Sequence, residues 1–529
     1  MRRVAFWIVL ACLVACMVAP VAHSQPAKVE NPYRVSGVVV NSVTGQRLSQ
    51  VRLVMTPEGR SAPETTMTTG TDGKFWFAGL PAGKWSLYAE RKGFVRQGFG
   101  QRPLPGSPVS AVVTGAGLVT EDVVFRLDPP AAIRGKVIDD SGEPVAGAAL
   151  QVLMRIAGGR RRYLVLKAAS TDDLGEYRIY DLPAIECYLV AVARPVDSGQ
   201  ALNPEAAEAG PAKIAYAPEY FPHTTDPRAA SPLQLKPGEE IPADFVLKRA
   251  RGVSLNIEGA SGSDGLLLSA EGAQGAEVML GMLGPGQGRA FRDIAPGRYK
   301  LTVVDTRTGT QASKRIEVGP EGATVALPFP EPAAVTAKVR VVDGDASLAQ
   351  KAVILLHAEG EMQAQARMQD KDGQLTFPGM AAGRYRLFLG QVPELYVKSL
   401  TVQGAKAVNG FVDIPETGPV QLDIVASGDG GRVRGTVQAN GKPLVSALVL
   451  LAPRVDSENS ADYHCFQSES DGSFEYTGVQ PGEYVLFATT DWQIEYGNPA
   501  AIRKYLAAGR AIHVEPKQTI EAKLEPLRP

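Results

Sequence analysis

Histidine and cysteine, the side chains on which zinc sites most depend, are few in this 529-residue sequence, with five His and four Cys. Beyond the first 24 residues the histidines are His223, His357, His464 and His513, and none has the H-x-x-E or H-E-x-x-H spacing that a zinc peptidase needs. His464 adjoins Cys465, but neighbours on a strand point to opposite faces, which argues against a shared metal ion. We therefore predict no catalytic residue, no metal site and no cofactor. A hydrolase site assembled from distant parts of the chain stays open as a minor alternative.

Aromatic side chains are the best candidates for contacting a ligand. Trp76 lies between Phe75 and Phe77 on a predicted strand, so its ring should face outward while theirs face the core. Exposed rings can stack on sugar faces or anchor partner proteins, but they can equally pack against a neighbouring loop or domain. The candidate ligand-contacting residues are Trp76, Trp492, Tyr496, Tyr216, Tyr220 and Phe221.

These side chains must be positioned by a stretch that recurs five times. The copies read DGKFWFAGLPAGKWSLYA from Asp72, LGEYRIYDLPAIECYLVA from Leu174, GQGRAFRDIAPGRYKLTV from Gly286, DGQLTFPGMAAGRYRLFL from Asp372 and DGSFEYTGVQPGEYVLFA from Asp471. Asp-Gly is a turn signal, and the alternating apolar residues that follow predict a strand with one buried face. Each copy therefore encodes a turn, a strand, a second turn and a second strand.

The second turn of the motif carries a glycine in four copies. Pro296-Gly297 and Pro481-Gly482 predict type II turns with positive φ at the glycine. Ile185 replaces this glycine in the second copy, so that turn should adopt another geometry. A large ring follows two residues after the glycine and should fill the core, and Cys187 takes the place of this ring in the second copy. The four rings are Trp85, Tyr299, Tyr385 and Tyr484.

Residues around the motif extend the pattern in three copies. The strand openings Arg134-Gly135-Lys136-Val137 and Arg434-Gly435-Thr436-Val437 precede the turns Gly142-Glu143-Pro144 and Gly441-Lys442-Pro443, and the first copy opens alike with Ser36-Gly37-Val38. This series resembles the carboxypeptidase regulatory-like family, which is related to transthyretin-like and Cna-B-type modules. The third and fourth copies match mainly in the second half. The resemblance implies antiparallel β-sandwiches of about seven strands, close to the immunoglobulin plan, that act as accessory domains without catalysis.

The expected fold is all-β, a tandem array of about five antiparallel immunoglobulin-like or transthyretin-like β-sandwiches with one short helix near the C-terminus. The spacing of the motif copies is that of one sandwich domain. Short junctions between the units predict a semi-rigid string of beads. Asn498, Pro499 and Gly509 have the types expected at the ends of a helix. The predicted units are unit 1 (33–128), unit 2 (129–249, with a loop insertion over 195–237), unit 3 (250–330), unit 4 (331–428) and unit 5 (429–527).

The N-terminus predicts export. Residues 1–24 combine Arg2 and Arg3, an apolar stretch and a small-residue cleavage site before Gln25, as in a secretory signal peptide, and 25–32 form a polar linker. The run ending at Cys16 also resembles a bacterial lipobox, so a lipid anchor at Cys16 is the alternative to cleavage near Ser24. We predict no transmembrane span in the mature chain. The mature chain keeps two cysteines, Cys187 and Cys465, in different units, so we expect free thiols.

Together these features favour a bacterial cell-envelope protein that binds or supports rather than catalyses. The 55 basic and 56 acidic residues give a net charge of -1, which argues against a nucleic-acid partner. The predicted function is that of a secreted or periplasmic structural or adhesive stalk, or a protein-binding module. The alternative is a carbohydrate-binding protein that uses Trp76 and Trp492. The corresponding partners are an envelope or extracellular protein, or a polysaccharide.

Overall fold

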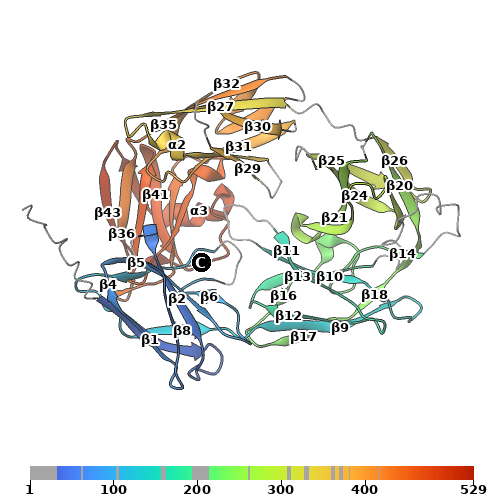
Figure 1. Ribbon diagram of the computed structural model, residues 1–529, viewed down its shortest axis with the longest axis horizontal. Helices are drawn as coiled ribbons and strands as arrows, with labels where there is room; N and C mark the ends of the chain where they lie inside the picture. The colour runs from blue at the N-terminus through green and yellow to red at the C-terminus, as the bar shows by residue number, and fades with distance from the viewer. Residues whose placement is uncertain are drawn as a thin grey trace, which may run out of the picture.

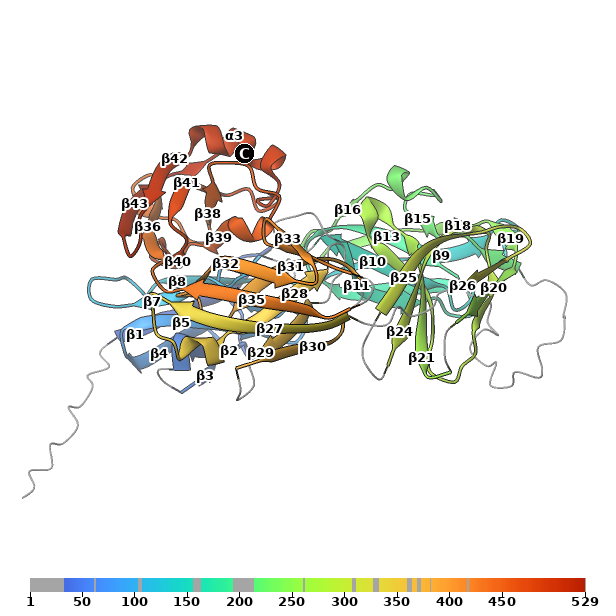
Figure 2. The ribbon, with the colours of Figure 1, turned by 90° about the horizontal axis from the view of Figure 1, so that it is seen from above.

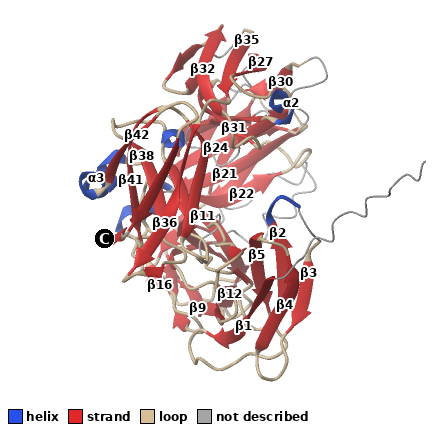
Figure 3. Cartoon of the chain, turned by 90° about the vertical axis from the view of Figure 1, so that its left-hand side faces the viewer, coloured by secondary structure: helices blue, strands red, loops and turns tan. Residues whose placement is uncertain are grey.

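The computed structural model has an all-β architecture, in which almost every described element of secondary structure is a strand (Figure 3). It describes residues 33–60, 63–102, 107–155, 163–193, 214–259, 262–306, 311–326, 333–358, 364–368, 373–380, 382–415 and 418–528. The predicted signal peptide, the linker at 25–32 and Cys16 therefore lie outside the described residues, as does the first part of the insertion in unit 2.

Units 1 and 2 each consist of two facing sheets. In unit 1 the first sheet contains β4 (Lys74–Leu80), β1 (Tyr33–Asn41) and β8 (Val123–Leu127), and the second contains β3 (Thr65–Thr68), β2 (Arg52–Pro57), β5 (Gly83–Glu90), β6 (Gln97–Gly98) and β7 (Val112–Thr114). In unit 2 the first sheet contains β12 (Glu176–Leu182), β9 (Ala131–Asp139), β17 (Glu240–Pro242) and β18 (Phe245–Leu247). Its second sheet contains β11 (Tyr163–Ser170), β10 (Ala149–Arg155), β13 (Glu186–Val192), β15 (Glu219–Tyr220) and β16 (Leu233–Gln234), and β14 (Ile214–Tyr216) pairs separately with β19 (Arg249–Arg251).

Units 3 and 4 repeat this plan. Unit 3 has β23 (Ala290–Ile294), β20 (Val253–Glu258) and β26 (Ala323–Ala326) facing β22 (Glu277–Leu283), β21 (Asp264–Glu271), β24 (Gly297–Asp305) and β25 (Gln311–Val318). Unit 4 has β30 (Leu375–Met380), β27 (Ala333–Val342), β35 (Val420–Ser427) and β32 (Tyr396–Gln403) in one sheet. The other sheet contains β29 (Ala364–Met368), β28 (Val353–Ala358), β31 (Gly383–Gly390), β34 (Phe411–Ile414) and β33 (Lys406–Val408), and a short helix α2 (Leu348–Lys351) precedes β28.

Unit 5 adds a helix to the same plan. Its first sheet contains β37 (Lys442–Pro443), β36 (Gly431–Ala439), β40 (Ser473–Val479) and β43 (Thr519–Leu524), and its second contains β39 (His464–Gln467), β38 (Leu448–Pro453), β41 (Gly482–Thr489), β42 (Arg510–Val514) and β44 (Pro526–Leu527). The predicted helix is confirmed as α3 (Pro499–Ala508), where the Asn498 side chain accepts a hydrogen bond from the Ala500 backbone N–H at 3.2 Å. The Tyr505 ring stacks on Phe487 at 5.4 Å, so α3 covers the outer face of this sheet.

The tandem β-sandwiches are thus confirmed, with at least one parallel strand pair in each first sheet. The opening strand of every unit pairs in parallel with a late strand, as β1 does with β8 and β36 with β43. Each unit encloses its own apolar cluster, and the four motif rings and Cys187 are buried in these clusters. We propose the five predicted ranges as the domain boundaries because each range contains one such cluster between two sheets.

The second turn of the motif differs from the prediction. Neither Gly297 nor Gly482 has a positive φ, so the predicted type II geometry is wrong at both turns. The residue with positive φ lies earlier, at a bulge near the end of the first motif strand. In units 1, 2, 3 and 5 it is Gly79, Asp181, Asp293 and Gly478, with φ between 53 and 72°. The bulge bends the strand before the reversal, which removes the need for a left-handed residue at the turn itself.

The five units do not form a linear string. They follow one another around a ring-like path, and unit 5 returns to lie beside unit 1 (Figures 1 and 2). The side-chain amide of Gln467 donates hydrogen bonds to the Gly100 carbonyl oxygen at 2.9 Å and to Ser110 Oγ at 2.6 Å. The Ser470 backbone N–H donates to the Ala111 carbonyl oxygen at 3.0 Å. Short junctions gave no indication of this return, because the contact joins the two ends of the array.

We call this contact the closure interface. Its core is polar and buried, since Ser110 and Ser468 are fully inaccessible and Gln467 and Glu469 are each 3% exposed. Lys84 Nζ lies 3.2 Å from Glu469 Oε1, and the Ala111 N–H donates to Glu469 Oε2. Polar groups that are buried with partners favour one arrangement of the two surfaces over any other. The closure interface comprises Lys84, Gly100, Ser110, Ala111 and Val113 of unit 1 with Ser446, Gln467, Ser468, Glu469 and Ser470 of unit 5.

Candidate functional site

Trp76 is exposed on the outer face of the first sheet of unit 1. Its relative exposure is 55%, while Phe75 and Phe77 on either side are buried, as alternation along β4 requires. The corresponding positions of units 2 and 5 are Arg178 and Glu475, and both form ion pairs across their sheets. Unit 1 therefore presents an aromatic ring where two sister units present paired charges.

Trp492 and Tyr496 lie against the apolar cluster beneath α3 and are partly buried. The Arg102 guanidinium of unit 1 lies 5.0 Å from the centre of the Trp492 ring, and burial lowers the pKa of Arg102. The indole Nε1 of Trp492 is buried and has no hydrogen-bond partner among the residues that the structure describes. Burial also raises the pKa of Tyr496. These two rings pack next to the closure interface and offer little free surface to a ligand.

The three aromatic residues of the unit 2 insertion pack against apolar clusters of the protein. Tyr220 is 1% exposed and its hydroxyl donates to the Glu271 carbonyl oxygen of unit 3 at 3.1 Å, which is the packing against a neighbouring domain that was the alternative to ligand contact. The reason is that β15 pairs with β13 and turns Tyr220 into the apolar cluster between units 2 and 3. Tyr216 and Phe221 are partly buried against the core of unit 2.

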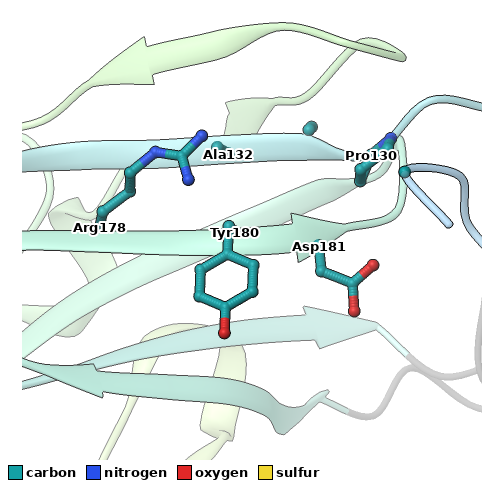
Figure 4. A pocket seen from close by; sticks show the side chains of 7 residues that line it. Pro130, Ala132, Arg178, Tyr180 and Asp181 are labelled. Carbon is teal, nitrogen blue, oxygen red and sulfur yellow. The ribbon is translucent and has the colours of Figure 1, made fainter.

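A cleft not predicted from the sequence lies at the junction of units 1 and 2 (Figure 4). Its volume is about 330 Å³, and the Tyr180 ring projects from β12 between Arg178 and Asp181. Tyr180 is 60% exposed, which makes it the most exposed tyrosine among the residues that the structure describes. Its outward position follows from period-two alternation with the buried Ile179, so the sequence did contain the signal. The cleft is lined by Gly93, Pro130, Ala131, Ala132, Arg178, Tyr180 and Asp181.

Hydrogen bonds hold both walls of this cleft. On the side of unit 1, the Asp128 N–H donates to Oε1 of Gln97 in β6 at 2.9 Å, and the Val95 N–H donates to the Asp128 carbonyl oxygen at 2.9 Å, which fixes the junction against the loop after β5. On the side of unit 2, Lys167 Nζ donates to the Tyr180 carbonyl oxygen at 2.7 Å and lies 3.6 Å from Asp181 Oδ2. The cleft is therefore formed before any ligand arrives, as is usual for small-molecule sites.

The cationic groups around Tyr180 are partly neutralised. Arg178 Nε donates to Glu240 Oε1 at 2.9 Å, and this bond raises the pKa of Arg178 and lowers that of Glu240. Lys167 Nζ lies 4.8 Å from the centre of the Tyr180 ring, within the range of a cation–π contact. The cleft thus presents one aromatic ring and groups of both charge signs.

Groups suited to chemistry are dispersed or buried in the described part of the chain. No group of three or more His, Cys, Asp and Glu side chains there could hold a metal ion. Burial raises the pKa of Cys187 and of Cys465 to about 12, which leaves both thiols protonated at neutral pH. Burial lowers the pKa of His464. No helix within the described ranges is long and apolar enough to cross a membrane.

Comparisons with known proteins identify one unit by sequence. The chain has 13% identity to the Bacillus anthracis TIE protein over 74% of this chain and 73% of that chain, with a TM-score of 0.18. It has 13% identity to the minor pilin of Streptococcus agalactiae over 41% of this chain and 96% of that chain, with a TM-score of 0.21. It has 12% identity to the shaft pilin SpaA from Lactobacillus rhamnosus GG over 41% of this chain and 97% of that chain, with a TM-score of 0.19. No curated protein matches the chain. Residues 34–121 match the model of the carboxypeptidase regulatory-like domain, the family that the motif resembles.

Proposed function

We propose that this chain is an exported, non-catalytic protein of the cell envelope that acts as a structural or adhesive scaffold and binds other proteins. The observation that supports this best is the closure interface, where a buried polar network joins the first and last units. Joining the ends of an array limits the motion of every unit between them. The units then present their loops and outer sheet faces in a fixed arrangement, which suits a scaffold.

Unit 5 has a central place in this scaffold. Besides unit 1 it contacts unit 4, where Arg386 donates to Ser460 Oγ at 2.5 Å, and unit 2, where Arg155 donates to the Gln493 carbonyl oxygen at 2.5 Å. A protein that acts as an extended stalk has no use for such cross-contacts. We therefore favour a compact platform over the extended stalk that the sequence suggested.

A second candidate function is carbohydrate binding, and the exposure of Trp76 favours it. A Trp ring that is 55% exposed on the outer face of a sheet can stack on the apolar face of a sugar ring. Trp492 was the other candidate for this role, but it is packed beside Arg102. Trp76→Ala should weaken retention on a polysaccharide in this case, and Lys74→Ala on the same strand is the matched control.

One retention experiment distinguishes the two candidate functions. The mature chain (25–529) is immobilised on beads and incubated with isolated bacterial envelopes, untreated, treated with protease, or oxidised with periodate. Loss of retention after protease alone supports protein binding, and loss after periodate alone supports carbohydrate binding. Absence of retention from untreated envelopes contradicts both.

Export itself is tested by mass spectrometry of the protein from a bacterial host. A chain that begins at Gln25 supports cleavage of a signal peptide, and a diacylglyceryl adduct on Cys16 supports the lipoprotein alternative. A chain that keeps Met1 and stays in the cytoplasm contradicts export.

A further inference from the structure

Two junctions in this protein are built from the same elements and can be compared directly. At each junction, the loop after the second motif strand of one unit faces the end of the first motif strand of the next unit. These elements are the Gly93 loop and β12 for units 1 and 2, and the Pro393 loop and β40 for units 4 and 5. In motif alignment, Tyr180 and Asp181 correspond to Thr477 and Gly478.

The junction of units 4 and 5 is closed. Thr477 Oγ1 donates to the Pro393 carbonyl oxygen at 3.2 Å. A Cβ atom added to Gly478 would lie 2.4 Å from the same oxygen, so the backbone of unit 4 leaves no room for a side chain there. At this junction the end of the strand serves only to join two units.

The junction of units 1 and 2 is open at the same place. Gly93 stands where Pro393 stands, and a cleft of about 330 Å³ separates its loop from β12. Asp181 occupies the left-handed bulge position, with φ 58°, that Gly79 and Gly478 occupy in units 1 and 5. Asp293 takes the same position in unit 3, so the fold accepts aspartate as well as glycine here, and what distinguishes Asp181 is its place at the rim of the cleft.

The side chains around the opening have the chemistry of a saccharide site. The Tyr180 ring is 60% exposed, with Lys167 Nζ 4.8 Å and Arg178 Cζ 6.0 Å from its centre, and the part of the ring that these cations leave open can stack on the C–H groups of a sugar. Arg178 and Asp181 flank the ring on the same strand (Figure 4). Each charged group has an ion-pair partner that orients it, Glu240 for Arg178 and Lys167 for Asp181, and each keeps more than half of its side chain exposed. A guanidinium and a carboxylate in fixed positions can pair with adjacent hydroxyl groups of one ring.

We infer that the cleft at the junction of units 1 and 2 binds one sugar ring of a neutral glycan, with Tyr180 as the stacking platform and Arg178 and Asp181 as hydroxyl partners. This inference rests on the second candidate function and moves its site from isolated rings to a preformed cleft between two units. The mixed charge of the walls favours a neutral polyhydroxylated ligand over an ion. A volume near the lower end of the ~300–1,000 Å³ typical of small-molecule sites fits a short saccharide segment.

The test is titration calorimetry with neutral oligosaccharides that a glycan array selects for the mature chain. Tyr180→Ala should weaken binding about tenfold, the loss expected for one stacked ring. Asp181→Gly copies the residue of units 1 and 5, so it should keep the fold and still weaken binding about fivefold or more. Trp76→Ala distinguishes the cleft from the isolated ring of the second candidate function. Met282→Ala, at a unit 3 side chain that is 61% exposed and outside the cleft, is the control, and near-ultraviolet circular dichroism checks that each variant is folded.

The outcomes distinguish this site from the function on which it rests. Wild-type protein that binds no glycan contradicts the carbohydrate function and the cleft together. Glycan binding that Trp76→Ala abolishes and Tyr180→Ala leaves unchanged supports the function and overturns this site. Binding of sulfated or uronic-acid glycans only overturns the assignment of a neutral ligand.

Discussion

Lys84 of unit 1 and Glu469 of unit 5 form an ion pair between the two ends of the chain, with Nζ 3.2 Å from Oε1. The Glu469 side chain is 5% exposed and that of Lys84 is 29% exposed, so water screens this pair less than a surface pair. The Ala111 N–H also donates to the Glu469 carboxylate. The pair thus lies at the centre of the closure interface.

Removing the lysine should weaken closure. Lys84→Ala leaves a buried carboxylate without its cation, and we expect a loss of about 1–3 kcal/mol in the free energy of unfolding together with a larger radius of gyration. Urea unfolding and small-angle X-ray scattering measure the two quantities. Lys74→Ala is the control, because its partner Asp72 is 3.8 Å away and both side chains are more than half exposed, and its effect should stay below about 0.5 kcal/mol. Equal effects of the two variants would mean that closure does not depend on the pair.

Closure should also depend on pH through Glu469. Burial raises the pKa of Glu469 above its ordinary value, and Lys84 offsets only part of this shift. The closed form therefore binds a proton more readily than the open form. The contribution of this group to stability is fully present below the ordinary pKa of glutamate and is lost as the pH rises through the raised pKa.

The measurement for this pH dependence is the difference in unfolding free energy between wild type and Glu469→Gln, taken from pH 4 to pH 8. Glutamine keeps an acceptor for the Ala111 N–H but does not titrate. We expect wild type to lose stability relative to this variant as the pH rises. A difference that stays constant, or that grows in favour of wild type, contradicts the assigned direction.

The two tryptophans of unit 1 should behave differently. Trp85 is 2% exposed and donates from Nε1 to Thr114 Oγ1 at 3.1 Å, so Trp85→Ala should lower the stability of unit 1 by about 3–5 kcal/mol. Trp76→Ala removes a ring that is 55% exposed and should change stability by less than about 0.5 kcal/mol. Urea unfolding of the two variants checks both values. A large loss on Trp76→Ala would place that ring in a packed contact and weaken its candidacy as a ligand platform.

Two glycines of unit 5 form a matched pair for the junction with unit 4. Gly441 and Gly478 have similar positive φ values of 73 and 63°, so alanine costs about 1–2 kcal/mol at either position through backbone strain. A Cβ atom at Gly441 meets nothing within 4 Å, whereas one at Gly478 would lie 2.4 Å from the Pro393 carbonyl oxygen. Gly478→Ala should therefore lose more stability than Gly441→Ala in thermal unfolding. Equal losses would show that the contact with unit 4 contributes little.

Local patterns in the sequence predicted the local structure well. Alternation gave the buried Phe75 and Phe77 and the outward Trp76, and residue types gave α3 with its Asn498 cap. The same alternation places Tyr180 outward, but a single outward tyrosine has no meaning until the Gly93 loop is known to face it. The left-handed bulge had a signal as well, because Gly or Asp recurs just before the apolar residue that ends the strand, as at Gly478.

No local pattern in the sequence predicted the closure interface. Ser110 and Gln467 lie more than 350 residues apart, and each looks like an ordinary polar loop residue in its own surroundings. Partners so distant are found only when the orientation of every intervening unit is known. The burial of Tyr220 had the same cause, since its partner Glu271 belongs to the next unit.

The distance along the chain between Ser110 and Gln467 also fixes an order of events in synthesis. A ribosome releases unit 1 long before it makes the strand that covers Ser110, so this polar edge stays in water while most of the protein is still being made. A chain cut short before Gln467 would lack the residues that cover Ser110, so this polar edge of unit 1 would stay exposed to water.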